Sequence, residues 1–571
     1  MIQFRRMLIW GAAALVVAGP LVLRLASEPA LAATVSADAN KPGAFGAFLA
    51  GMHAQELKDY GAAADYLADV LAHDPDNVDL MQQAFIAMAS EGRLNEAAEL
   101  GRKLDAQKAG SETVSLILAE QELKARKMKA ALDRLGKLPT EGLNRFTVPM
   151  VRAWALLENG KLDDALAAIK PLADVKGVQT LYTLHVGMLN EVGGKAADAD
   201  KAYQDTIDDP SKLSFRVAEI IGNFYQRQKQ PDKAKAVYDK FHDAYPDNPL
   251  LPLLVGDETD SKAAPIVGNA REGLAEALFN LGSVLYQEDA RDMALVYARL
   301  ALDLRPDFPA AQVLLGDLLS AGQRFADAAV VYRGVDQSSP FGWQARLALA
   351  DALNRIDRTQ EAVTLLQGMT DERKDSADAP MMLGDILRSS DRFAEAATAY
   401  DTAISRLGTL KPQHWSLLYY RGIAFERSKQ WDRAQADFLK ALEFEPDQPY
   451  VLNYLAYSWV DKGENYDRAL DMLRKAVDQK PDDGYIVDSL GWVYFRLGKY
   501  DQAVEQLEKA VELVPEDSTI NDHLGDAYWR VGRHNEARFQ WQRALNLKPD
   551  QDQIAPIQSK VERGLPNSSG S

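Results

Sequence analysis

Cysteine is absent from the 571-residue chain. Its absence excludes disulfide bonds, thiolate metal sites and cysteine nucleophiles, and also the lipid-modified cysteine that anchors a lipoprotein to a membrane. The compartment in which the protein works must therefore be inferred from other features of the sequence.

Clusters of basic residues are also absent. The formal net charge is -18, and no Lys- or Arg-rich block interrupts the acidic excess. Binding to nucleic acid requires basic side chains that neutralise a row of phosphates. Nucleic acid is therefore not an expected partner.

Recognisable catalytic motifs are missing as well. The chain has no glycine-rich phosphate loop and no G-x-S-x-G elbow, and no two of its seven histidines have the H-x-x-x-H spacing of a metal site. His523 lies in a sequence, Asn521 to Asp526, that resembles a catalytic motif, but a packed or hydrogen-bonded histidine in a helix is the favoured interpretation. We expect a protein without catalysis, cofactor or metal, and an enzyme built on the repeats described below is the alternative.

The N-terminus has the pattern of an export signal. Arg5 and Arg6 precede an apolar stretch over residues 7–23, and Ala30-Leu31-Ala32 matches an A-x-A cleavage site. We interpret residues 1–32 as a signal peptide and residues 33–43 as a flexible linker. An uncleaved anchor is the alternative, because the apolar stretch is long for a signal core. In both cases the bulk of the chain is expected outside the cytoplasm, most simply in a bacterial periplasm.

Small residues recur with a period of about 34 residues, which is typical of paired helices. A first series of positions is Gly51, Phe85, Ala119, Ala153, Gly187, Gly222, Gly282, Gly316, Ala350, Gly384, Gly422, Ala456, Gly491 and Gly525. A second series follows about twelve residues later and is alanine throughout: Ala63, Ala97, Ala131, Ala165, Ala199, Ala234, Ala294, Ala328, Ala362, Ala396, Ala434, Ala469, Ala503 and Ala537. Two helices that cross closely leave no room for a larger side chain, so each period predicts one helical hairpin.

The residues around these positions resemble the tetratricopeptide repeat family over roughly residues 44–550. The matching motifs are Leu490-Gly491 with Tyr494, Leu524-Gly525 with Tyr528, and Asn535-Glu536-Ala537 ahead of Ala544 and Pro549. The resemblance implies an all-α fold, a right-handed superhelical solenoid of about 14 helix-turn-helix repeats, and a function in protein binding.

The regular spacing is interrupted between Gly222 and Gly282, which divides the repeats into two blocks. We predict an N-terminal block over residues 44–246, an inserted linker over residues 247–270 and a C-terminal block over residues 271–550. Residues 551–571 are expected to form a short helix and a disordered end. The linker is interpreted either as a surface loop that joins two stacks or as a segment that folds back into a groove.

In the tetratricopeptide family, the first helix of each repeat contributes four residues to the concave face. They lie six and three residues before the position of the first series, and one and four residues after it. The resemblance therefore implies a protein-binding groove that is aromatic and acidic in the last repeats. Its candidate residues are Tyr419, Tyr450, Asn453, Tyr457, Tyr485, Asp488, Trp492, Phe495, Asp522, Asp526 and Trp529. Asp317, Asp351 and Asp385 extend the same line in earlier repeats.

Buried aromatic side chains are common anchors of protein recognition, although some of these rings can instead pack against the neighbouring repeat. The lysine and asparagine clamp by which some family members hold acidic chaperone C-termini is missing. We therefore expect a partner segment that is apolar or basic.

Three stretches also resemble envelope tetratricopeptide proteins of Gram-negative bacteria. They begin at Asn453, Asp488 and Asn521, the last being followed by Glu536-Ala537-Arg538 and Gln540-Trp541. That group includes an outer-membrane adaptor lipoprotein that delivers cell-wall hydrolases to a carboxyl-terminal processing protease. The resemblance implies an envelope scaffold or adaptor with a processing protease and cell-wall hydrolases as partners, and with membrane contact only if the signal is uncleaved. A component of polysaccharide export or outer-membrane assembly is the alternative.

Overall fold

The computed structural model describes residues 43–208, 213–245 and 263–566. The predicted signal peptide, nearly all of the linker that follows it and most of the 247–270 insertion lie outside these residues. In the described part of the chain, 29 α-helices account for nearly all of the regular structure and no strand is present. This confirms the predicted all-α solenoid.

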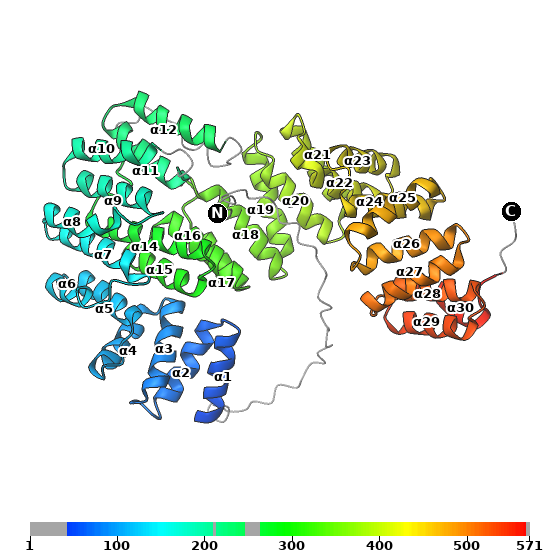
Figure 1. Ribbon diagram of the computed structural model, residues 1–571, viewed down its shortest axis with the longest axis horizontal. Helices are drawn as coiled ribbons and strands as arrows, with labels where there is room; N and C mark the ends of the chain where they lie inside the picture. The colour runs from blue at the N-terminus through cyan, green and yellow to red at the C-terminus, as the bar shows by residue number, and fades with distance from the viewer. Residues whose placement is uncertain (1–42, 209–212, 246–262, 567–571) are drawn as a thin grey trace.

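The helices form 14 successive hairpins and one further helix at the C-terminal end (Figure 1). The hairpins are α1 (Ala44–Glu56) with α2 (Tyr60–Leu71), α3 (Val78–Glu91) with α4 (Leu94–Ala106), α5 (Glu112–Lys124) with α6 (Met128–Leu135), α7 (Asn144–Glu158) with α8 (Leu162–Ile169), α9 (Gln179–Val192) with α10 (Ala196–Ile207), α11 (Phe215–Arg227) with α12 (Pro231–Ala244), α14 (Ala270–Gln287) with α15 (Arg291–Leu304), α16 (Pro309–Ala321) with α17 (Phe325–Arg333), α18 (Gly342–Arg355) with α19 (Thr359–Glu372), α20 (Asp378–Ser389) with α21 (Phe393–Leu407), α22 (Trp415–Arg427) with α23 (Trp431–Phe444), α24 (Pro449–Lys462) with α25 (Tyr466–Gln479), α26 (Gly484–Arg496) with α27 (Tyr500–Leu513), and α28 (Ser518–Arg530) with α29 (His534–Asn546). The final helix is α30 (Gln551–Arg563).

Each hairpin closes on the two series of small residues. The second-series alanines are all completely buried, from Ala63 to Ala537. The first-series glycines face a large side chain of the second helix: a Cβ at Gly422 would lie 2.6 Å from the ring of Phe438, and a Cβ at Gly384 would lie 2.5 Å from the ring of Tyr400. The two helices therefore approach closely because one of them lacks a side chain at the crossing.

The second hairpin uses the same packing with the two partners exchanged. Phe85 occupies the first-helix position, and the residue that faces it in α4 is Gly101. The ring of Phe85 lies 3.6 Å from the place where a Cβ of Gly101 would be, which is ordinary van der Waals contact. What each hairpin requires at this crossing is thus one large and one minimal side chain, from either helix.

The N-terminal repeats wrap around the hairpin that follows the insertion. Helix α14 packs against α7 and α9, and α15 packs against α3 and α5. The aromatic ring of Trp154 in α7 lies directly over Gly273 of α14, and the hydroxyl groups of Thr147 and Tyr297 are 2.7 Å apart. Residues on both sides of the insertion therefore belong to one packed body.

A buried ion pair joins the same two parts of the chain. The guanidinium group of Arg216 in α11 donates two hydrogen bonds to the carboxylate of Glu276 in α14, at 3.1 and 2.7 Å. The side chain of Glu276 is 0% exposed and that of Arg216 is 12% exposed. Arg216 also pairs with Glu219 at 2.7 Å, so both of its nitrogen-bearing edges are engaged.

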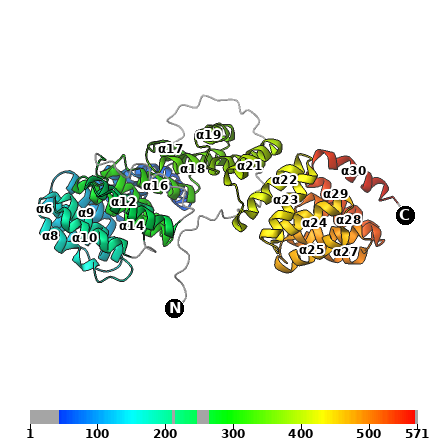
Figure 2. The same cartoon turned by 90° about the horizontal axis from the view of Figure 1, so that it is seen from above.

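Contacts at the start of the chain close this body further. The hydroxyl of Tyr60 donates to Asp292 of α15 at 2.8 Å, and Arg324 pairs with Glu91 at the same distance. From α18 onward, the repeats leave the closed body and continue as an open arc that ends at α30 (Figures 1 and 2). The structure therefore has a closed N-terminal part and an arc of C-terminal repeats.

Candidate protein-binding groove

The concave face of the N-terminal repeats is occupied by the chain itself. Most of the first-helix positions that line a groove in this type of repeat are buried in the third, fourth and fifth hairpins. They are Leu116, Glu120, Leu123, Thr147, Met150, Trp154, Leu157, Leu184 and Met188. Because α14 and α15 fill this space, the inner face of these three hairpins is closed to a partner, whereas groove positions are exposed at Phe45 and Ile86 in the first two hairpins and at Tyr485 in the C-terminal arc.

The predicted groove residues lie on four first helices of that arc, α22, α24, α26 and α28. Helices α24, α26 and α28 lie next to one another, and α22 precedes them in the stack. Tyr485 is 55% exposed, whereas the carboxylates of Asp488, Asp522 and Asp526 are buried. The other predicted residues are half-buried: Tyr419, Tyr450, Asn453, Tyr457, Trp492, Phe495 and Trp529.

Tyr419 is used mainly for packing between repeats. Its ring lies against the rings of Tyr420, Phe438 and Tyr454, with centroid distances of 5.3 to 6.1 Å. Burial raises the pKa of the Tyr419 hydroxyl far above its usual value of 10, so the ring stays neutral. Tyr419 therefore supports the groove more than it faces a partner.

Trp492 belongs to a stack of three rings. Its indole lies nearly parallel to the imidazole of His523, with centroids 4.0 Å apart, and to the ring of Phe495, with centroids 4.9 Å apart. The indole N–H of Trp492 is buried and has no hydrogen-bond partner. The stack joins α26 to α28, so Trp492 contributes to the stability of the groove as well as to its surface.

His523 is held by a carboxylate. Its Nδ1 atom lies 2.9 Å from Asp488 of the preceding repeat, and both side chains are buried. Burial disfavours the charged imidazole, but the carboxylates of Asp488, Asp522 and Asp526 outweigh this effect and raise the pKa of His523 above 6.5. The structure thus agrees with the interpretation of His523 as a hydrogen-bonded histidine, in contact with groove residues.

The raised pKa of His523 predicts a pH dependence of stability. A group with a raised pKa in the folded state stabilises fully below its unfolded pKa of 6.5, and this contribution is lost as the pH rises through the folded value. We expect the difference in melting temperature between the wild type and His523→Gln to shrink between pH 6 and pH 9. Comparing the two proteins removes the contribution of groups that titrate in the same way in both. A difference in melting temperature that stays constant from pH 6 to pH 9 would contradict the raised pKa of His523.

The acidic positions of the last repeat are paired within the chain. The ammonium group of Lys560 in α30 lies 2.7 Å from Asp522 and 2.8 Å from Asp526. The indole N–H of Trp541 donates to the other oxygen of Asp526 at 2.8 Å. Burial raises the pKa of Asp526 to about 6, and Asp522 adds to this effect whereas Lys560 opposes it. The predicted acidic character of the groove is therefore largely neutralised at this end.

Trp529 is covered by the chain that follows α30. Gly564 lies against its indole ring with no room for a Cβ, and it has a φ of +75° that favours glycine. Lys560 and Gly564 are not among the predicted groove residues. The repeat period could have indicated Lys560, because this residue follows Asp526 by one period and so occupies the equivalent position.

The acidic residues of earlier repeats also have internal partners. Tyr332 donates to Asp317 at 2.6 Å and Tyr400 donates to Asp385 at 2.7 Å, each from the second helix of the same hairpin. Burial raises the pKa of Asp317 to about 6. Asp351 lies 3.6 Å from Arg355. Asp317 and Asp385 join the two helices of their hairpins, whereas Asp351 pairs within its own helix, and the negative charge of all three is only partly available to a partner.

Four predicted residues keep groups that are accessible or lack a hydrogen bond. Tyr485 is exposed, Tyr450 and Tyr457 are half-buried, and no hydrogen bond to the side-chain oxygen of Asn453 is formed. Tyr450, Tyr457 and Tyr485, on α24 and α26, make up a set of candidate groove tyrosines that are at least partly accessible. We call it the tyrosine face.

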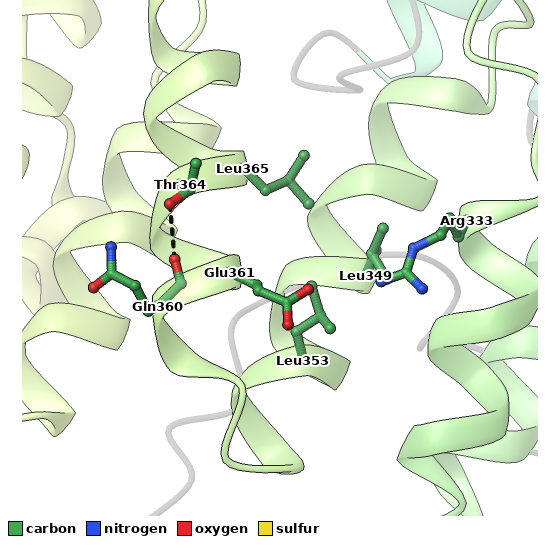
Figure 3. A pocket seen from close by; sticks show the side chains of 7 residues that line it. All are labelled: Arg333, Leu349, Leu353, Gln360, Glu361, Thr364 and Leu365. Carbon is green, nitrogen blue, oxygen red and sulfur yellow. Dashed lines mark hydrogen bonds between the residues drawn. The ribbon is translucent and has the colours of Figure 1, made fainter.

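A pocket of about 410 Å³ lies elsewhere, between α17, α18 and α19 (Figure 3). It is lined by apolar side chains, including Leu349, Leu353 and Leu365, and by the charged groups of Arg333 and Glu361. None of the predicted groove residues contributes to it. Over the described ranges, no cluster of three or more histidines and carboxylates is arranged to hold a metal ion, and no helix is both long and apolar enough to cross a membrane.

Helical hairpins with closely crossing small residues, stacked into a solenoid, define the class of helical repeat proteins. Models of the tetratricopeptide repeat match residues 220–248, 275–308, 313–379, 381–449, 427–484, 491–532 and 519–551. Together these matches cover more than half of the chain, and it belongs to the tetratricopeptide repeat family. Proteins of this family generally mediate protein–protein interaction and are typically not catalytic.

Solved structures with similar folds are distant in sequence. The Cut9–Hcn1 hetero-tetramer of APC/C is 15% identical, with 91% of this chain and 96% of that chain covered and a TM-score of 0.37. Yeast Tom70 is 14% identical, with 91% and 95% covered and a TM-score of 0.29. A tetratricopeptide repeat protein from Parabacteroides merdae is 16% identical, with 50% and 98% covered and a TM-score of 0.34. No curated protein matches the sequence.

Proposed function

We propose that the protein is a scaffold or adaptor that binds a segment of a partner protein on the inner face of its C-terminal repeats. The observation that carries the proposal is the contrast between its two inner faces. The inner face of the third to fifth hairpins is filled by α14 and α15, whereas on the tyrosine face of the C-terminal repeats Tyr485 is exposed and Tyr450 and Tyr457 are half-buried. Tyrosines of this kind bury a large area at low entropic cost.

The partner segment is proposed to be apolar with basic residues. The tyrosine face supplies apolar area, and the inner face carries carboxylates such as Asp488 and Asp317 whose charge is only partly compensated.

The location is proposed to be the bacterial envelope, on the basis of the signal-like residues 1–32. Delivery of substrates such as cell-wall hydrolases to a carboxyl-terminal processing protease is the proposed adaptor role. It is supported by the resemblance of the stretches that begin at Asn453, Asp488 and Asn521 to envelope proteins of this family.

The proposal is tested by affinity capture from envelope extract with residues 33–571. A variant carrying Tyr450→Ala, Tyr457→Ala and Tyr485→Ala is run beside the control Phe539→Ala, which removes a ring that is 64% exposed on α29. Loss of anchor residues typically weakens binding by about tenfold or more, so we expect the triple variant to lose a processing protease or hydrolase that the control retains. Equal capture by the triple variant, with unchanged circular dichroism, would show that the partner binds elsewhere.

A further inference from the structure

Helix α30 lies at the end of the groove but is weakly integrated into the solenoid. Ile557 is its only buried residue within the described chain. In the preceding first helix, α28, residues 520–528 are all buried. Because apolar burial supplies most of the stability of a docked helix, α30 loses less apolar burial on separating from the last repeat than α28 would.

The site that α30 occupies is nevertheless built for a charged ligand. The carboxylates of Asp522 and Asp526 have side-chain exposures of 12% and 6%, and both lie within 2.8 Å of the Lys560 ammonium. Trp541 fixes the orientation of Asp526 by its hydrogen bond. One oxygen of Asp522 is buried without a hydrogen-bond partner.

Val561 and Leu565 of this segment also pack, partly buried, against the core of the C-terminal repeats, and its backbone accepts further hydrogen bonds. Arg538 donates to the carbonyl oxygen of Val561, and Arg530 donates to that of Pro566. Gly564 lies on Trp529, where a larger residue would not fit. Ile557 is the fully buried apolar side chain of α30, and Lys560 is the side chain that pairs with the carboxylates of the groove.

We propose that α30 is an internal ligand of the groove, and that Lys560 occupies a binding site for a lysine side chain of the partner segment. Displacement of α30 uncovers Asp522, Asp526 and Trp529 and extends the tyrosine face to the end of the arc. The competing segment carries a lysine with an aliphatic residue three positions before it, as in Ile557 and Lys560. This inference deepens the proposed function and rests on it for the role of the site.

The experiment uses the full chain and a fluorescent peptide of residues 549–566. An opened chain carries Ile557→Asp and Lys560→Glu, which prevent its own α30 from docking. We expect the peptide to bind the opened chain, and to bind the wild type roughly 100-fold more weakly, because the tethered helix competes at a high effective concentration. Fluorescence anisotropy measures both affinities.

Two controls identify the lysine site. Adding Asp522→Asn and Asp526→Asn to the opened chain, or replacing the lysine of the peptide by methionine, is expected to weaken binding by about tenfold or more. Equal binding to the wild type and the opened chain, or binding that survives the loss of both carboxylates, would overturn the proposal.

Hydrogen exchange of α28 and α29 shows that the opened chain keeps its last repeat. If these helices lose protection, Lys560→Met alone replaces the double substitution in the same assay. The assay needs no natural partner, so its outcome is independent of the capture experiment. If the peptide binds but capture fails, the proposed function is contradicted. If capture succeeds but the peptide does not bind, only the role of α30 is contradicted.

Discussion

Replacing Glu276 by alanine is expected to destabilise the N-terminal part of the protein by about 3–5 kcal/mol, because a buried guanidinium group loses its main partner. Glu276 is completely buried in α14, and Arg216 reaches it from α11 with two hydrogen bonds. Glu219 would remain as a second carboxylate beside Arg216 and would compensate only part of the loss. Urea unfolding, with hydrogen exchange of α14 as a local probe, measures the effect.

The matched control is Asp239→Ala on the outer helix α12. Its pair with Lys235 has side-chain exposures of 54% and 57%, and such pairs contribute about 0.5 kcal/mol or less. A change below about 1 kcal/mol for Glu276→Ala would contradict the view that this ion pair holds α14 inside the N-terminal repeats.

Exchanging the two partners of a helix crossing is expected to rescue two damaging substitutions. Phe438→Gly removes a fully buried ring and leaves a cavity in its place. It is expected to lower the free energy of unfolding by about 4–6 kcal/mol. Gly422→Phe places a ring where even a Cβ would lie 2.6 Å from Phe438, and overpacking of this kind costs about 1–3 kcal/mol or more. In the double variant the new ring fills the new space, as Phe85 and Gly101 do in the second hairpin.

The double variant should therefore be more stable than the sum of the two single effects by at least about 1 kcal/mol. Urea unfolding of all three variants gives this coupling energy. Combining Gly422→Phe with Leu135→Ala in a distant hairpin serves as the control and should be additive within about 0.5 kcal/mol. Additivity in the Gly422 and Phe438 pair as well would show that the exchanged packing of the second hairpin does not transfer to this one.

The pattern of small residues was sufficient to predict the fold because the contacts it reports are local. A first-helix glycine and the large residue that faces it lie in the two helices of one hairpin, as Gly422 and Phe438 do. Only a short loop separates these helices in the sequence, so each hairpin can be recognised without knowledge of the rest. The alanines of the second series are buried in every hairpin for the same reason. Repeat architecture thus follows from periodicity alone.

The groove was predicted less completely, since positions on the concave face were identified without their partners. Tyr485 is exposed, but Trp492 stacks on His523 and Asp522 binds Lys560. Whether a residue faces a ligand or its own chain depends on the neighbouring repeat, and in the last repeat on α30. Such contacts leave no regular pattern in the sequence.

The sequence by itself determined the helical hairpins, their number and the residues at which they cross, because the helices of one repeat meet within a short stretch of chain. Only the tertiary structure decided that α14 fills the N-terminal groove and that Lys560 closes the end of the C-terminal one. Both depend on the superhelical curvature that brings distant segments together, such as Arg216 with Glu276. That curvature is the sum of small rotations between repeats, which no single motif encodes.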